Sequence, residues 1–249
     1  MYLSRVEINP RLRATMLALN SPQRLHAIVA ASFPSSYVLG SVVEVPEQQP
    51  AQQPFAQQLT RPSKEQETQQ RQPVQRHLWR LDRLGHSLYV LVVSPVRPDF
   101  THLIEQLGWV SSQQTWETKP YEPFLERLRP GQRWQFRLRA NPTRSVKRPD
   151  APRKRGIVQA CVTIDEQKQW LAERVHKHGF SLQGFELVDR SVGSFKRQEE
   201  KITVHVATFE GLLKVEDPAL LRKALTEGIG RAKAYGCGLL TLARPHVGA

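Results

Sequence analysis

The sequence predicts an α+β fold, on the evidence of its length, its composition and the order of its strand and helix patterns. The chain has 249 residues, of which 39% are hydrophobic, so it can bury one large core or two ordinary ones. The order strand, helix, strand, strand, helix, strand occurs twice along it. That order is typical of the ferredoxin-like unit. We therefore expect two tandem ferredoxin-like (RRM-like) domains, over residues 1–125 and 126–249.

The N-terminal series begins with a strand over Tyr2–Ile8, where apolar and polar positions alternate. A helix follows, with Asn20 or Ser21 as its N-cap and Pro22 at its first position, where the missing N–H costs nothing. Its buried stripe would consist of Leu25, Ile28, Val29 and Phe33. The remaining elements are two strands, a helix and a last strand, expected at 77–84, 87–94, 100–107 and either 109–112 or 115–119.

The C-terminal series follows a joint between Pro120 and Gly131. Its elements are a strand, a helix, two strands, a helix and a short strand, expected at 133–140, 165–178, 180–192, 202–215, 219–227 and 238–243. A Gln- and Pro-rich tract at 46–75 interrupts the first series, and it holds too little apolar surface to offset the entropy of ordering it. We expect this tract to be a loosely held surface insertion.

The charge balance indicates an anionic partner. The chain carries 36 Lys and Arg against 23 Asp and Glu, a formal net charge of +13, and nucleic acid is the polyanion that fits best. No apolar run or basic amphipathic helix predicts membrane binding. The opening residues lack the apolar stretch of a signal peptide, which favours a cytoplasmic location. Cys161 and Cys237 lie far apart, so we expect neither a disulfide framework nor a zinc site.

Basic residues concentrate between Arg137 and Arg155, where eight of them accompany a single acid, Asp150. Three prolines oppose a helix, so we expect a projecting hairpin or loop that contacts a phosphate backbone. The alternative is a solvated charge run without a partner. RNA is favoured over DNA because β-α-β-β-α-β domains often bind RNA and no DNA-binding motif is legible. The candidate RNA-binding residues here are Arg139, Arg144, Lys147, Arg148, Arg153, Lys154 and Arg155.

A Gly-rich segment near the C-terminus permits two interpretations. Its glycines are Gly228, Gly230, Gly236 and Gly238. They do not form a dinucleotide-binding G-x-G-x-x-G motif, because Lys233 occupies the last required position and the segment follows a helix. The segment could cradle RNA phosphates on its backbone amides, with charge from Arg231 and Lys233. It could equally contain tight turns that need a positive φ.

Four sequence blocks resemble the CasE family, subunits of the type I-E CRISPR Cascade complex within the RAMP superfamily. The blocks are MYLSRVEINP at the start, RLRANP at 137–142, FEGLL at 209–213 and GIGRAKAYGCGLLTLA at 228–243. The resemblance spans nearly the whole chain apart from the Gln-rich tract. It implies two ferredoxin-like domains, recognition of the CRISPR repeat RNA stem-loop, cleavage at the 3′ base of the stem to give mature crRNA, and retention of the product within Cascade.

The resemblance also indicates a catalytic histidine. The family places one in the first helix, with six residues between it and a Phe-Pro pair, and His26 stands at that interval from Phe33-Pro34. Histidine titrates near neutral pH and suits proton transfer, so His26 is the candidate general acid or base, and the sequence leaves the two roles open. Without the resemblance a lone histidine would be read as structural. The other histidines, including His77, are interpreted as strand, helix-surface or tail residues.

The resemblance implies cleavage without a metal or other cofactor, by attack of the 2′-hydroxyl on the adjacent phosphate to leave a 2′,3′-cyclic phosphate. The sequence has no paired carboxylates at metal-binding spacing, which agrees with that route. Well-known family members have a tyrosine three residues before the histidine, where this chain has Gln23. Glutamine can form hydrogen bonds but cannot shuttle a proton, and Tyr37 or a nearby lysine is a possible substitute.

Three other functions compete with this hypothesis. A non-catalytic RNA-binding subunit of a CRISPR ribonucleoprotein would explain both the charge and Gln23. A two-histidine phosphoesterase would need a pair of His-x-Ser/Thr motifs, and the segment that starts at His205 reads His-Val-Ala. A generic DNA-binding module is the third, and competition between repeat RNA and duplex DNA would separate it from an RNA-binding protein.

Overall fold

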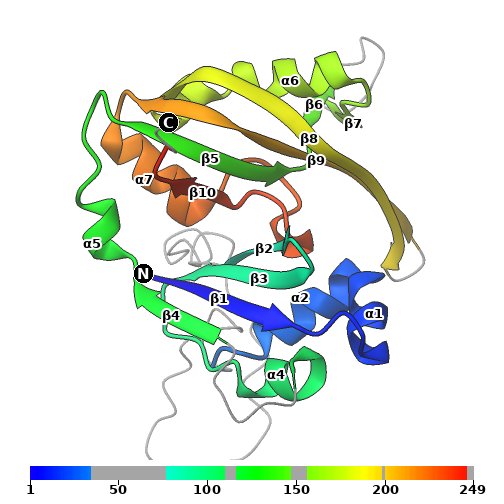
Figure 1. Ribbon diagram of the computed structural model, residues 1–249. Helices are drawn as coiled ribbons and strands as arrows, with labels where there is room; N and C mark the ends of the chain where they lie inside the picture. Colours follow the sequence, from blue (N-terminus) through cyan, green and yellow to red (C-terminus); the bar gives the residue numbers. More distant parts are fainter. Residues whose placement is uncertain (35–76, 110–115, 147–155, 198–199, 246–249) are drawn as a thin grey trace, which may run out of the picture.

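The structure is a computed structural model that describes residues 1–34, 77–109, 116–146, 156–197 and 200–245. It contains two four-stranded antiparallel sheets, one from each half of the chain, with helices packed on them (Figure 1). In each sheet the first and third strands of the series lie in the middle and the second and fourth lie at the edges. The predicted α+β class and the repeated order of elements are confirmed. None of the described helices is long and apolar enough to cross a membrane.

The N-terminal sheet has the strand order β2-β3-β1-β4. The elements of this half are β1 (Tyr2–Ile8), α1 (Arg13–Leu19), α2 (Pro22–Ala30), β2 (Leu78–Leu84), β3 (Ser87–Ser94), α4 (Thr101–Leu107) and β4 (Trp116–Pro120). Ser21 is the N-cap of α2, and its hydroxyl accepts a hydrogen bond from the Arg24 N–H at 3.3 Å. The last strand is the later of the two predicted alternatives. Helix α1 was not predicted.

The core of this half lies between the sheet and its helices. Val6 and Ile8 of β1 and Val90 and Val92 of β3 alternate onto one face, where they pack against the apolar stripe of α2. All four residues predicted for the buried stripe are buried, and they are Leu25, Ile28, Val29 and Phe33. Helix α2 is therefore fixed along one side while its other side remains available for a site.

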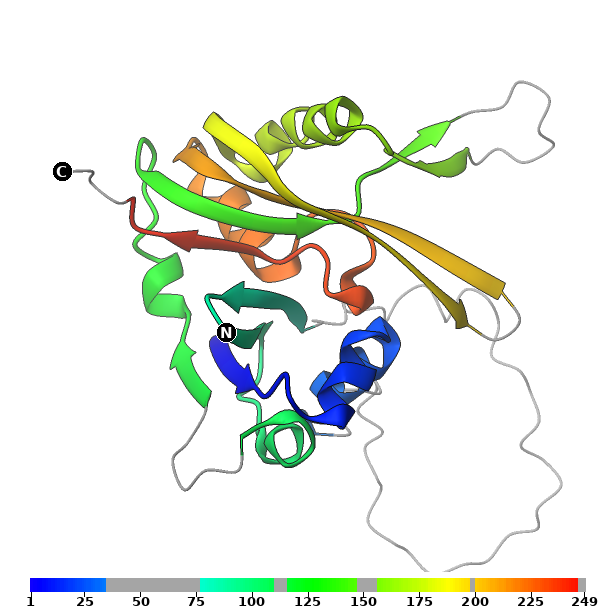
Figure 2. The ribbon, with the colours of Figure 1, turned by 45° about the vertical axis from the view of Figure 1, so that its right-hand side comes forward.

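The C-terminal sheet has the order β10-β5-β9-β8. Its elements are α5 (Glu122–Leu125), β5 (Arg133–Ala140), β6 (Thr143–Val146), β7 (Ile157–Ala160), α6 (Ile164–Ala172), η1 (Val175–His178), β8 (Phe180–Arg197), β9 (Glu200–Val215), α7 (Pro218–Glu227), η2 (Lys233–Tyr235) and β10 (Leu240–Ala243). Strands β6 and β7 form a separate antiparallel hairpin, the shape expected for the basic stretch. Figure 2 shows this hairpin and the far ends of β8 and β9 projecting on the same side of the molecule.

The two halves share an apolar cluster. Leu78 of β2 and Val93 of β3 pack in the same cluster as Phe136 and Leu138 of β5 and Leu225 of α7. The predicted domain boundary at residue 125 coincides with the end of α5. Because one apolar cluster contains residues from both sides of that position, the division into two domains stays a prediction. The predicted insertion at 46–75 lies outside the described residues.

A buried polar network also joins the halves. Arg80 of β2 is 2% exposed, and its guanidinium makes a two-point contact with Asp82, at 2.8 and 2.7 Å. Its other N–H groups reach the C-terminal half, where they donate to the carbonyl oxygens of Arg137 and Leu239 and to the Thr241 hydroxyl. Because successive side chains of a strand point to opposite faces, Trp79 lies on the other side of β2, toward α2.

Candidate active site

His26 lies on α2, beside the buried stripe, and its ring is half-buried. The Trp79 indole N–H donates a hydrogen bond to His26 Nδ1 at 3.3 Å. The ring of His77 stacks on the His26 ring with centroids 5.4 Å apart, and Phe33 stacks on His77 at 4.7 Å. Four aromatic rings from α2, its C-terminal end and the start of β2 therefore form one cluster, which we call the histidine cluster.

Both histidines of this cluster favour the neutral form. Burial lowers the pKa of His26. Burial, reinforced by the charge of His26, lowers the pKa of His77 to about 4. A charged imidazole loses hydration when it is buried, and two stacked imidazoles cannot both be protonated without repulsion. The rings are consequently uncharged near neutral pH.

The Gly-rich segment lies against the histidine cluster, because η2 packs on both α2 and β2. All four predicted glycines have a positive φ, and they are Gly228, Gly230, Gly236 and Gly238. At Gly236, with a φ of 73°, a Cβ atom would also lie 2.8 Å from the Trp79 ring. The positive φ and the close approach of the Trp79 ring therefore explain why residue 236 is a glycine. Contact of the Gly-rich segment with RNA phosphates stays a prediction.

Some of the predicted basic residues lie in or beside the Gly-rich segment. Lys233 is half-buried on η2, and Arg231 is exposed at the start of the same turn. Arg139 of β5 is half-buried, and its carbonyl oxygen accepts a hydrogen bond from the Gly238 N–H at 2.6 Å. The structure thus brings the Gly-rich segment of the C-terminal half, with Lys233, against the helix of the N-terminal half that carries His26.

Arg144 lies elsewhere, on the β6–β7 hairpin. Its guanidinium pairs with Glu166 of α6 at 3.0 Å, and the side chain is 55% exposed. The remaining predicted RNA-binding residues lie outside the described residues, and they are Lys147, Arg148, Arg153, Lys154 and Arg155. Within its described strands, the β6–β7 hairpin therefore offers one exposed guanidinium, which is paired with a carboxylate, and contact of the hairpin with RNA stays a prediction.

Two contacts of His26 are not predicted by the sequence. The sequence pattern places His77 in a strand, whereas it precedes β2 and stacks on His26. Trp79 is the second contact. Strand alternation could have placed Trp79 on the same face of β2 as the helices, but no pattern in the sequence pairs it with a histidine 53 positions earlier.

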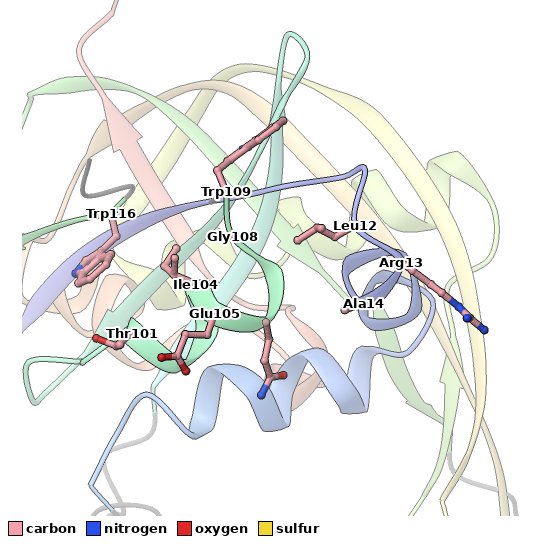
Figure 3. A pocket seen from close by; sticks show the side chains of 10 residues that line it. Leu12, Arg13, Ala14, Thr101, Ile104, Glu105, Gly108, Trp109 and Trp116 are labelled. Carbon is pink, nitrogen blue, oxygen red and sulfur yellow. The ribbon is translucent and has the colours of Figure 1, made fainter. Parts of the chain in front are cut away.

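A pocket of 580 Å³ opens between α1 and α4, away from these residues (Figure 3). Its walls include Leu12 and Ala14 on one side and Ile104, Trp109 and Trp116 on the other. It contains none of the predicted catalytic or RNA-binding residues. In the part of the chain that the structure describes, no group of three or more His, Cys, Asp or Glu side chains could hold a metal ion.

Comparisons with known proteins agree with the motifs. A family model described as CRISPR associated protein matches residues 1–244. The CRISPR-associated endoribonuclease Cse3 of Thermus thermophilus is 35% identical over 183 residues, which cover 68% of this chain and 80% of the relative. The chain belongs to the Cse3/CasE family. The Cascade subunit CasE of Escherichia coli is 30% identical over 116 residues, 43% of this chain and 56% of that relative.

The family fold extends over the whole chain. A solved structure of the endoribonuclease Cse3 bound to a 19-nucleotide RNA matches with a TM-score of 0.70 and 25% identity, and the match covers 98% of this chain and all of that one. The crystal structure of Cas6e from Escherichia coli matches with a TM-score of 0.59 at 21% identity, a likeness of fold. The predicted membership of the Cse3/CasE family is confirmed.

Proposed function

We propose that this chain is a metal-independent endoribonuclease that binds the CRISPR repeat stem-loop and cleaves it at the 3′ base of the stem to release mature crRNA. It would then remain on its product as a Cascade subunit, in the cytoplasm where transcripts are made. The relatives named above, an endoribonuclease and a Cascade subunit, support this assignment. The observation that carries it is the half-buried His26 beside a cationic, glycine-rich turn.

The proposed reaction is an in-line attack by a 2′-hydroxyl. A bond forms between O2′ and phosphorus while the bond from phosphorus to O5′ breaks, which leaves a 2′,3′-cyclic phosphate and a 5′-hydroxyl. One proton leaves the 2′-hydroxyl and one is delivered to O5′. An imidazole that is uncharged near neutral pH can accept the 2′-hydroxyl proton on its lone pair, or donate a hydrogen bond from its N–H to an oxygen on which negative charge develops. General acid–base assistance accelerates a reaction by roughly 10²–10⁴-fold.

The basic residues would hold the RNA by its phosphates. Lys233 on η2, next to α2, and Arg231 just before it would hold the phosphates at the cleavage site, Arg139 would add charge beside the Gly-rich segment, and the β6–β7 hairpin with Arg144 would contact the backbone farther along the stem. The positive-φ turn around Gly236 would let backbone amides approach a phosphate closely. Each neutralised phosphate releases counterions, so we expect binding to weaken steeply with salt.

The second candidate function is RNA binding without cleavage, and Gln23 favours it. This residue lies one turn before His26 on α2, where the helical spacing places both on one side of the helix. The glutamine amide has no proton to transfer at neutral pH, so the reaction would lose one acid–base group relative to family members with tyrosine there. Binding and cleavage therefore need separate measurements.

The test is incubation of the full chain with its cognate repeat hairpin in EDTA, with the new 3′ end analysed by mass. We expect a 2′,3′-cyclic phosphate, and we expect His26→Ala to slow cleavage by roughly 10²–10⁴-fold while the hairpin still binds. His102→Ala, an exposed histidine on α4, is the matched control and should cleave normally. Loss of cleavage on adding the chelator, or full activity in His26→Ala, would contradict the proposal. Tight binding without cleavage by the wild type would favour the second function.

A further inference from the structure

The contact between Trp79 and His26 restricts where the histidine can carry its proton. An indole nitrogen is a hydrogen-bond donor and never an acceptor. Because the Trp79 N–H points to His26 Nδ1 at 3.3 Å, Nδ1 must supply a lone pair. A neutral imidazole has one N–H group and one lone pair, so its proton lies on Nε2. Among the described residues, Nε2 has no protein partner and is available to a ligand.

Trp79 is held too firmly to turn its N–H elsewhere. The side chain is 2% exposed and packs in the core of the N-terminal half with Leu25 and Val29. Its backbone is paired with Val92 of β3. Gly236 leaves no room on the indole, since a Cβ atom there would lie 2.8 Å from the ring. A buried indole N–H without an acceptor is costly, so the Trp79 contact orients both rings.

The same contact opposes protonation of His26. In the cation both ring nitrogens are donors, so the Nδ1–H would face the Trp79 N–H without an acceptor between them. Burial of the ring and the stacked His77 act in the same direction. The other charged or titratable groups on α2 and on the elements packed against it are Arg13, Arg24, Arg80, Asp82, Arg83, His102, Glu105, Lys233 and Tyr235.

We infer that Trp79 is a positioning residue that fixes the tautomer of His26, so that the ring presents its Nε2–H to the RNA as a hydrogen-bond donor. A base that removes the 2′-hydroxyl proton would need a lone pair at that nitrogen, and this tautomer has none there. His26 is thus assigned to the oxygen atoms on which negative charge develops, and not to the 2′-hydroxyl. Neutral imidazoles serve as such donors in other enzymes. That the ligand is RNA rests on the proposed function. The tautomer itself rests on the hydrogen bond from Trp79.

The test is a nitrogen-15 spectrum of histidine-labelled full-length protein, with His26 assigned by its loss in His26→Ala. We expect wild-type His26 to carry its proton on Nε2 and to leave Nδ1 unprotonated at pH 7.5. Trp79→Phe keeps an aromatic ring but removes the N–H, so it should raise the pKa of His26 and lower kcat by roughly 10–100-fold with little change in RNA affinity. Trp134→Phe, which removes the indole N–H bonded to Gln132, is the control and should leave the His26 pKa unchanged.

Two outcomes would overturn the inference, a proton on Nδ1 in the wild type or an unchanged His26 pKa in Trp79→Phe. Should Trp79→Phe fail to fold, the wild-type spectrum decides alone, because it needs no variant. Failure of the proposed function has a different signature. Full cleavage by His26→Ala would end the assignment of His26 to the reaction, while the tautomer in the spectrum would be unaffected.

Discussion

Neighbouring residues on β2 serve two polar sites that differ in how completely their hydrogen bonds are used. Arg80 faces the C-terminal half, and all five of its N–H groups have acceptors. Trp79 faces α2 and donates to His26, whose second ring nitrogen has no protein partner within the described residues. Arg80, which joins the two halves of the fold, thus uses every hydrogen bond that it can donate. His26, which we propose acts on RNA, keeps one ring nitrogen without a hydrogen bond to the described residues. The comparison predicts which substitutions reduce stability and which reduce activity.

The largest expected effect on stability is at Arg80. Arg80→Met would leave the Asp82 carboxylate buried without its two-point partner, at 5% exposure, and would also remove one donor from each of the Arg137 and Leu239 carbonyl oxygens. Loss of one member of a buried ion pair costs about 3–5 kcal/mol. Urea unfolding should therefore show a free energy of unfolding lower by that amount. Arg83→Ala, an exposed arginine on the same strand, should change it by less than about 0.5 kcal/mol.

A double variant tests whether the lost stability comes from leaving the Asp82 charge buried without a partner. Arg80→Met combined with Asp82→Leu removes both charges, so much of the lost stability should return. Arg137 also contacts Asp82, at 3.4 Å, but it has a second partner in Glu210 at 3.0 Å. If Arg80→Met were as stable as the wild type, a full set of hydrogen bonds would not be a sign that a side chain stabilises the fold.

The sequence predicts a strand or helix correctly where the segment itself carries a clear pattern of apolar residues or a capping signal. Alternation located β1 at Tyr2–Ile8, and the helix signals located α2, including its Ser21 cap. Helix α1 escaped prediction because it has no clear apolar stripe. Met16 and Leu17 are 49% and 45% exposed while Thr15 is buried, and the helix has no capping side chain at its start. Local patterning fails where tertiary contacts decide which side chains are buried.

The candidate site was only partly predictable. His26 was identified through the family resemblance, and the charge of the Gly-rich segment was legible in the sequence. The contacts that set the chemistry of His26 come from His77 and Trp79, which are distant in sequence and are brought near only when β2 pairs in the sheet. The role of Arg80 is not predictable from the sequence either, because three of its five acceptors belong to the other half, and two of those three are backbone carbonyls.

A smaller effect is expected from His77, as a dependence of stability on pH. Its folded-state pKa of about 4 lies below the value near 6.5 of an unfolded histidine. The unfolded chain binds the proton more readily, so this contribution to stability is complete above pH 6.5 and is lost as the pH falls toward 4. The loss should be on the order of 2–3 kcal/mol. Urea unfolding of the wild type and His77→Phe between pH 7.5 and 4.5 would measure it.

His77→Phe keeps the stack on Phe33 and removes the titrating group, so its stability should fall less over this pH range. His86→Phe changes an exposed histidine in the turn between β2 and β3 and should retain the wild-type dependence. Equal pH dependence in the wild type and His77→Phe would mean that burial of this ring does not penalise its protonation. The histidine cluster would then lack the low-dielectric surroundings that keep His26 neutral.

The smallest effect on stability is expected at Arg144, which is 55% exposed and has one ion-pair partner, Glu166. Exposed pairs contribute little, so Arg144→Ala should change the free energy of unfolding by less than about 1 kcal/mol. If its donors serve the RNA, the variant should bind the repeat hairpin more weakly, and the slope of log K against log salt should become shallower by about 1. Arg127→Ala, an exposed arginine near α5, is the control and should keep the wild-type slope. An unchanged slope in Arg144→Ala would remove the β6–β7 hairpin from the RNA contact, and a loss of stability as large as that of Arg80→Met would end the distinction between saturated and unused donors.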